Sequence, residues 1–413
     1  MTQNLSVKTL QIRHRYVPLE TQPHLSSVHI SCARPSTVSA RYQFPASSVP
    51  RAQNRTPSRK VTSNLTQSSS SSVYRAQNSV HAVTTADAAT AIAMSLPRRP
   101  LGRTGLNLSI VSFGASPLGS VFEEIDEEEG VRAVHEAVNL GINLFDVSPF
   151  YGSTRAETVL GRAIATLPCP REDVVIATKV GRYGQDEFDF SAGRIKRSVE
   201  ESCARLQTPY VDIVQCHDIE FGSLDQIVNE TIPALQELKA AGKIRFIGIT
   251  GLPLSVYRSV LPRLLPGSLD LILSYCHYSL NDTTLEPLLP WLQQQGVGVI
   301  SASPFSMGLL TPQGPPSWHP APQPLKDACK AAALACEQRG ASLPRLALQF
   351  ATINPAITTT LVGMCTVQQV RENVAAAIEA AERGIDEAML KEVEGILAPY
   401  KDTTWASGRP ENN

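Results

Sequence analysis

The sequence has 413 residues, and its 37 Lys and Arg nearly balance its 38 Asp and Glu, leaving a net charge of −1. This balance gives no electrostatic reason to expect a nucleic-acid partner, and no apolar run approaches the roughly 20 residues that span a bilayer, so we expect no membrane partner either. The eight cysteines are scattered, without a C-x-x-C pair or a histidine cluster at metal-ligand spacing. We therefore expect reduced thiols and no bound metal.

The first part of the chain, residues 1–96, differs in composition from the rest. It is rich in Ser, Thr, Gln and Arg, contains the homopolymer Ser68–Ser72, and has only Glu20 and Asp87 as acidic residues. Such a segment cannot bury enough apolar surface to offset its ordering entropy, so we predict a disordered leader. The same composition is typical of a chloroplast or mitochondrial transit peptide. An upstream extension before a true start at Met94, or a retained tail, are the alternatives.

From Leu101 onward, short β-branched runs alternate with helical patterns. The predicted strands are Ile110–Phe113, Ile142–Phe145, Val174–Thr178, Val211–Gln215, Arg245–Ile249, Leu269–Ser274, Val297–Ala302 and Thr359–Val362. The helical patterns between and after them are Glu127–Leu140, Ala192–Leu206, Leu224–Ala241, Thr284–Gln295 and Val367–Ala381. This alternation predicts either a barrel or a doubly wound sheet. The count of eight strands, and the lack of a G-x-G-x-x-G after the first one, favour an α/β fold of the (β/α)8 TIM-barrel type.

Three segments lie outside the barrel repeat. A short β-hairpin at Leu101–Leu108 precedes the first strand and is placed to plug the bottom of the barrel. Two extra helices are predicted at Leu325–Arg339 and Glu387–Leu397. We therefore divide the chain into the leader at 1–96, one barrel domain at 97–399 and a C-terminal tail at 400–413.

Polar side chains mark the ends of three successive predicted strands. Asp146, Lys179 and His217 end the second, third and fourth strands, and Tyr151 follows Asp146 by five residues. Taken singly, such an Asp more often caps a helix, such a Lys is more often solvated, and such a His more often bonds to backbone. The carboxyl ends of the strands of a (β/α)8 barrel open onto its active site. We therefore predict that the four residues form a catalytic group.

The segment that contains two of these residues resembles a known family signature. Gly141–Asp146 is followed by Tyr151-Gly152, then by Glu157 and Leu160-Gly161, and this pattern resembles that of the aldo-keto reductases. The similarity covers Leu101 to about Ala381. It implies a (β/α)8 barrel that transfers a hydride between an alcohol or carbonyl group and a nicotinamide cofactor.

The chemistry of that transfer explains why the four residue types are needed together. Removing a hydroxyl proton calls for a base, and Tyr151 is a weak one because an ordinary tyrosine pKa is about 10. The ammonium group of Lys179 stabilises the phenolate, and Asp146 holds the lysine. His217 is expected to bond to the substrate oxygen and orient it.

The resemblance places the cofactor site in late loops. It implies that Ser303, Phe305, Met307 and Gly308 contact the pyrophosphate, and that Gly363, Met364, Gln369, Glu372 and Asn373 hold the adenosine. Gly363 as a plain tight turn and Asn373 as a solvated helix residue remain alternatives. Family members that use the 2′-phosphorylated cofactor carry basic residues at two positions where this chain has Gly363 and Gln369. We therefore expect NAD as the cofactor.

Other strings narrow the resemblance within the family. Ala115–Phe122 and Cys216–Phe221 resemble members that oxidise L-galactose at C1 to L-galactono-1,4-lactone, a step toward ascorbate. The sugar contacts expected on this basis are Phe122, Tyr183, Asp218 and His277, and Glu220 and Asp189 could also line a polar pocket at the barrel mouth. Apart from Phe122, each of these residues is equally compatible with a place on the rim. The alternatives are another aldose or an aldehyde such as pyridoxal, or a nucleotide-sensing module with little turnover. The resemblance implies a cytoplasmic monomer or homodimer, whereas the leader favours an organelle.

Overall fold

The computed structural model describes residues 95–413. The leader predicted at residues 1–96, and its interpretation as a transit peptide, therefore lie outside the described residues except for the last two positions. One of these two, Leu96, is 5% exposed and belongs to the main hydrophobic core. Packing thus begins before the domain boundary predicted at residue 97.

Eight parallel strands close into a barrel in the order β10-β3-β4-β5-β6-β7-β8-β9. Their bounds are β3 Val111–Gly114, β4 Leu144–Asp146, β5 Val175–Val180, β6 Val211–Cys216, β7 Ile244–Gly251, β8 Leu271–Tyr275, β9 Gly298–Ala302 and β10 Thr359–Gly363. Each overlaps one of the predicted strands. Strands β4, β5 and β6 are buried along their whole length, as expected where a parallel sheet is covered on both faces. The predicted (β/α)8 fold is confirmed.

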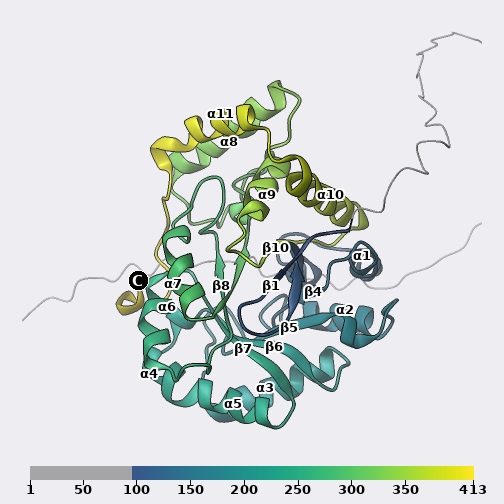
Figure 1. Cartoon of the computed structure of the whole chain (residues 1–413), viewed down its shortest axis with the longest axis vertical. Helices are drawn as coiled ribbons and strands as arrows, with labels where there is room; N and C mark the ends of the chain where they lie inside the picture. Colours follow the sequence, from purple (N-terminus) through teal and green to yellow (C-terminus); the bar gives the residue numbers. More distant parts are fainter. Residues whose placement is uncertain (1–94) are drawn as a thin grey trace, which may run out of the picture. The chain divides into compact units, whose positions relative to one another are not determined.

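Helices surround the barrel (Figure 1). They are α1 Glu127–Asn139, α2 Arg155–Ile164, α3 Ala192–Arg205, α4 Leu224–Gln226, α5 Ile232–Ala240, α6 Ser255–Val260, α7 Leu289–Gln294, α8 Gln323–Gln338, α9 Leu343–Ile353, α10 Val367–Arg383 and α11 Glu387–Leu397. Helices α2, α6 and α9 were not predicted. The single helix predicted at Leu224–Ala241 is interrupted by a π-helical turn at Ile227–Thr231. Pro233, just beyond that turn, has no N–H to donate to it.

The N-terminal hairpin closes the end of the barrel at which the strands begin. Strand β1 (Arg98–Pro100) pairs antiparallel with β2 (Asn107–Ser109). Leu101 and Leu108 are fully buried in a cluster with side chains from the barrel strands. The plug predicted for the bottom of the barrel is therefore present.

The extra helices and the C-terminal segment add to the barrel in different ways. Helices α8 and α11 pack against each other around a second hydrophobic cluster (Figure 1). After α11 the chain returns along the barrel, so the segment expected as a plain tail is part of the fold. The backbone N–H of Arg409 and the side-chain amide of Asn412 both donate to the backbone carbonyl of Glu220, at 3.0 and 2.8 Å. The end of this segment also accepts a bond from Ser255 in α6.

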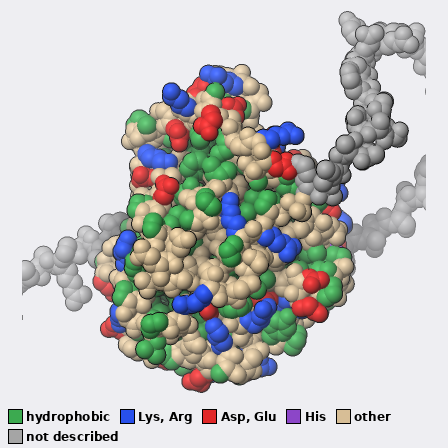
Figure 2. Space-filling model, viewed as in Figure 1, with side chains coloured by type: hydrophobic (Ala, Val, Ile, Leu, Met, Phe, Trp, Pro, Cys, Tyr) green, Lys and Arg blue, Asp and Glu red, His purple; other side chains and the backbone are tan. Residues whose placement is uncertain are grey.

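The surface of the described residues carries charges of both signs (Figure 2). Acidic and basic side chains are interspersed on the face drawn in Figure 2, around a central area rich in hydrophobic side chains. Among the helices that the structure describes, none is long and apolar enough to cross a membrane. The seven cysteines between residues 95 and 413 are free, and the same residues contain no group of three or more His, Cys, Asp or Glu that could hold a metal ion.

Candidate active site

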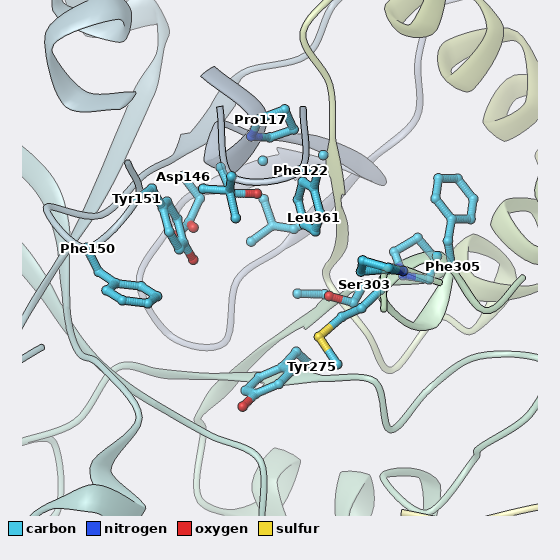
Figure 3. A pocket seen from close by; sticks show the side chains of 18 of the residues that line it. Pro117, Phe122, Asp146, Phe150, Tyr151, Tyr275, Ser303, Phe305 and Leu361 are labelled. Atoms are coloured by element: carbon cyan, nitrogen blue, oxygen red, sulfur yellow. The ribbon is translucent and has the colours of Figure 1, made fainter. Parts of the chain in front are cut away.

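A cavity of about 900 Å³ opens at the carboxyl ends of the barrel strands. Every strand contributes a residue at or directly beside its end, namely Gly114, Asp146, Lys179, His217, Thr250, Tyr275, Ala302 and Gly363. In Figure 3, Asp146, Phe150 and Tyr151 lie together on one side of this cavity, and Ser303 and Phe305 lie on the other. The four residues of the predicted catalytic group all line it.

A buried ion pair forms the floor of the site. Lys179, on β5, bonds to the carboxylate of Asp146, the last residue of β4, and also donates to the carbonyl of Val147 at 3.0 Å. The second carboxylate oxygen of Asp146 accepts from Gln215 at 2.8 Å. Burial disfavours the charged form of Lys179, but Asp146 and Tyr151 outweigh it and raise the lysine pKa above its usual value. The lysine is therefore a fixed cation.

Tyr151 lies directly beside this cation. The ammonium nitrogen of Lys179 is 4.9 Å from the centre of the phenol ring. Burial raises the pKa of Tyr151, and Lys179 opposes that rise. Lys179 is thus placed to favour the phenolate, but burial outweighs its effect on the tyrosine pKa in the protein alone.

Two glycines allow the backbone to hold Tyr151 in this place. Gly152 has φ +60°, and a Cβ atom there would lie 2.1 Å from the carbonyl oxygen of Gly119. A Cβ on Gly119 would in turn lie 2.7 Å from the backbone of Tyr151. Side chains at either position would push apart the two loops that follow β3 and β4. The loop continues with Ser153 and Thr154, which also have positive φ, a strained stretch of the kind found at functional sites.

His217 is a neutral hydrogen-bonding group. Burial lowers its pKa to about 3, and Lys179 adds to this effect. Its Nδ1 lies 3.1 Å from the hydroxyl oxygen of Ser148, which already accepts the N–H of Phe150. In the tautomer in which the Ser148 hydroxyl donates to Nδ1, the ring proton lies on Nε2. The imidazole meets the edge of the Tyr151 ring, with 5.7 Å between ring centres, so both can reach one substrate oxygen.

The residues predicted for the cofactor divide into two groups. Ser303, Phe305, Met307, Gly308, Gly363 and Gln369 line the cavity, whereas Met364, Glu372 and Asn373 are not part of its wall. Met364 is fully buried, and its N–H donates to the carbonyl of Gly114. Glu372 accepts a bond from Gln368 on the exposed side of α10. After β9 the backbone turns through Ser306, Met307 and Gly308, all with positive φ, and such turns form concave sites for anionic groups.

The residues predicted for the sugar also divide. Phe122 and Asp218 line the cavity, and Tyr183 and His277 do not. The hydroxyl of Tyr183 accepts the N–H of Gly181, and its ring is covered by Arg194 at 3.7 Å. His277 bonds to the carbonyl of Leu252 and to Asp282. Both side chains therefore bond to neighbouring protein groups and lie outside the cavity wall.

Sequence reasoning missed several residues of the cavity wall, including Arg182, Tyr275, Trp405 and Ser407. Arg182 follows Lys179 by three residues, beyond the turn at Gly181. Trp405 and Ser407 belong to the segment that was expected to be a tail. The one signal in the sequence was Trp405, because a large aromatic side chain in an otherwise polar segment indicates that the segment packs against the rest of the protein.

The chain was compared with known proteins. Residues 111–397 match the model of the Aldo/keto reductase family. The chain is 58% identical over 314 residues to L-galactose dehydrogenase of Arabidopsis thaliana, covering 76% of this chain and 98% of that one. It is 36% identical to D-arabinose 1-dehydrogenase of Saccharomyces cerevisiae over 55% of this chain and 70% of that one. Among solved structures, an aldo-keto reductase from Bacillus halodurans is similar, with a TM-score of 0.61 and 30% identity, over 75% of this chain and 98% of that one.

Proposed function

The chain belongs to the aldo/keto reductase family, and from this premise we propose that it is an NAD-dependent dehydrogenase that oxidises L-galactose at C1 to L-galactono-1,4-lactone, a step toward ascorbate. C1 of a cyclic aldose carries a hemiacetal hydroxyl, so loss of a hydride from carbon and a proton from oxygen gives a lactone with the ring already closed. The furanose gives the 1,4-lactone directly, and the pyranose gives the 1,5-lactone, which rearranges to the 1,4-lactone. The observation that carries the proposal is the joint placement of Asp146, Tyr151, Lys179 and His217 in one cavity. The similarity to the Arabidopsis enzyme supports the choice of sugar.

The protein groups have distinct tasks in this reaction. Bound NAD+ supplies the hydride acceptor. Tyr151 takes the proton from O1, and the ammonium group of Lys179 offsets the negative charge that then develops on the phenol. Asp146 holds that ammonium in place. His217, neutral and protonated on Nε2, donates to O1 and fixes its position against the base.

The cavity wall favours NAD over its 2′-phosphorylated form. Lys179 and Arg182 are the two Lys or Arg side chains in the wall that the structure describes, and both belong to the catalytic end. At the cofactor end, Gln369 accepts the N–H of Cys365. The pKa of that thiol is raised to about 11, by burial and by the carboxylates of Glu123 and Glu129. A 2′-phosphate at this end would meet acidic neighbours instead of a guanidinium.

The proposal is tested by NAD+ reduction with L-galactose, comparing the wild-type protein with Tyr151→Phe. General acid–base catalysis contributes roughly 10²- to 10⁴-fold, so we expect a loss of that size in kcat. NADH binding, measured by fluorescence titration, should change little. Retained turnover in the variant would overturn the catalytic assignment. Nucleotide binding without turnover of any sugar or aldehyde by the wild type would instead identify a sensing module.

A second aldose substrate follows from the chemistry of the relatives. One relative is a D-arabinose 1-dehydrogenase, and D-arabinose in its pyranose form has the same configuration as L-galactose at C2, C3 and C4. We therefore propose D-arabinose as an alternative substrate, ahead of simple aldehydes such as pyridoxal. A comparison of kcat/KM for NAD+ with either sugar against NADPH with aldehydes separates these cases.

We also propose a cytoplasmic location, as the resemblance of the barrel to its family implies. The first 94 residues lie outside the described part of the chain. Sequencing the N-terminus of the mature protein from cells tests this proposal, because cleavage within that region would indicate import into an organelle.

A further inference from the structure

One charged pair in the cavity has no task in the reaction described above. Asp218 follows His217 directly, and its carboxylate bonds to the guanidinium of Arg182. Both side chains line the cavity and are largely buried, with 6% and 15% of their surface exposed. Their mutual attraction often fails to repay the cost of burying two charges, so a buried pair is weak evidence for a purely stabilising role. The pair therefore calls for an explanation.

The carboxylate of Asp218 is held in one orientation. The residue has φ +50° and ψ +61°, in the left-handed region. Its N–H donates to the hydroxyl of Thr250 at 2.8 Å, and that hydroxyl donates back to Oδ1 at 3.1 Å. The other oxygen, Oδ2, bonds to Arg182 and lies 3.7 Å from Nε2 of His217. Each carboxylate oxygen can accept more than one bond, so Oδ2 keeps the capacity to accept a ligand hydroxyl.

The guanidinium of Arg182 is equally fixed. Its central carbon lies 3.9 Å from the centre of the Phe150 ring. Phe188 and Phe221, which stack on each other, flank it at 5.2 and 5.4 Å. Its Nε is buried and has no hydrogen-bond partner among the residues that the structure describes. A planar cation clamped by aromatic rings presents its donors in a set direction.

The position of the pair relative to the reaction centre identifies the sugar group that it meets. In the proposed reaction the substrate oxygen O1 binds at Nε2 of His217, and Oδ2 of Asp218 lies 3.7 Å from that nitrogen. The hydroxyl next to O1 on an aldose is the one at C2. A hydroxyl both donates and accepts, and this pair offers it one acceptor, the carboxylate of Asp218, and one donor, the guanidinium of Arg182.

We propose that Arg182 and Asp218 bind the C2 hydroxyl of the aldose, and that the enzyme selects substrates with a hydroxyl on the carbon beside the one oxidised. This inference rests on the proposed function and makes its substrate class more specific. L-galactose and D-arabinose both qualify, with the same configuration at C2. Sugars without that hydroxyl leave a buried, charged pair without its ligand, which is costly.

The test compares kcat/KM for L-galactose and 2-deoxy-L-galactose with NAD+. A hydrogen bond to a charged group contributes roughly 10- to 100-fold, so we expect a preference of that size for L-galactose in the wild type. Intrinsic reactivity favours the opposite order, because the C2 hydroxyl withdraws electrons from the C–H bond that loses hydride. Asp218→Asn, whose new amide tolerates the left-handed backbone, should reduce the preference to a few-fold, mainly by slowing L-galactose.

The matched control is Asp212→Asn. Asp212 lies near the start of β6, whereas Asp218 lies just beyond the end of that strand, and Asp212 is likewise paired with arginines, Arg171 and Arg245. This variant should lose thermal stability without changing the ratio of the two kcat/KM values, and NADH binding should be retained in both variants.

Two results would contradict the inference while leaving the proposed function intact. One is equal kcat/KM for the two sugars in the wild type. The other is an unchanged preference in Asp218→Asn. Failure of the wild type to oxidise either sugar would overturn the proposed function, and this inference with it.

Discussion

The protonation state of Glu220, a buried carboxyl group that bonds to Ser407 in the C-terminal segment, can be tested through the pH dependence of stability. One oxygen of this carboxyl accepts from the N–H of Leu252 at 3.1 Å and from the hydroxyl of Ser407 at 2.8 Å. The other oxygen is buried and has no partner among residues 95–413. Burial, followed by the charge of Asp218, raises the pKa of Glu220 from 4.5 to about 8. The group is therefore protonated at neutral pH in the folded protein.

A raised pKa makes stability depend on pH. Below pH 4.5 the group is protonated in both states, and its full contribution to folding is present. As pH rises from 4.5 to about 8, the unfolded chain loses the proton while the folded protein keeps it, so the free energy of unfolding falls. At about 1.4 kcal/mol per pKa unit, the total loss across this window is roughly 5 kcal/mol.

The substitution Glu220→Gln removes this ionisation and keeps an oxygen that can accept both bonds. We expect the variant to gain several kcal/mol on the wild type between pH 5 and pH 8.5, measured as free energies of urea unfolding. The control is Glu411→Gln, which changes an exposed carboxyl in the same segment and should track the wild type. Parallel curves for the wild type and Glu220→Gln would refute the reasoning.

Two further predictions concern the plug and the cofactor. Leu108→Ala should lower the free energy of unfolding by about 2–5 kcal/mol in urea, because the fully buried side chain fills the end of the barrel; a loss below 1 kcal/mol would mean that the plug is not packed as described. Gln369→Arg should narrow the ratio of kcat/KM for NAD+ over NADP+ by roughly tenfold, by supplying a partner for the 2′-phosphate. Arg371→Gln is its control, because Arg371 is exposed and paired with Glu136, and an equal shift in both variants would argue against the assignment.

The barrel was predictable because burial on both faces leaves a strong signal. A run such as Val174–Thr178 is apolar enough to identify a strand, and the structure places β5 at Val175–Val180. Helices were less predictable where proline interrupts them. The helix predicted at Thr284–Gln295 is reduced to α7, Leu289–Gln294, preceded by a 3-10 turn, with Pro287 and Pro290 in the first positions of the two elements.

The site was predictable where strand ends fix a side chain and less so where loops do. Asp146, Lys179 and His217 stand at or beside strand ends, whose direction the barrel determines. Tyr183 and His277 are polar loop residues whose orientation depends on local partners such as Gly181 and Leu252. Arg182 was missed because it also lies beyond a strand end. Its orientation depends on the aromatic rings that surround it, which come from distant parts of the sequence.

The closure of the barrel also constrains the order in which the chain can fold. The first barrel strand, β3, pairs with the last, β10, in a register that joins Val111 to Thr360. Arg99 reaches equally far, because its guanidinium donates to the carbonyls of Asn354 and Ile357. During synthesis, one edge of β3 stays unpaired until almost the whole barrel sequence has been made. Contacts so distant in sequence make folding slow and leave an open strand edge exposed to other chains. The newly made protein is thus most vulnerable to aggregation just before its last strand is added.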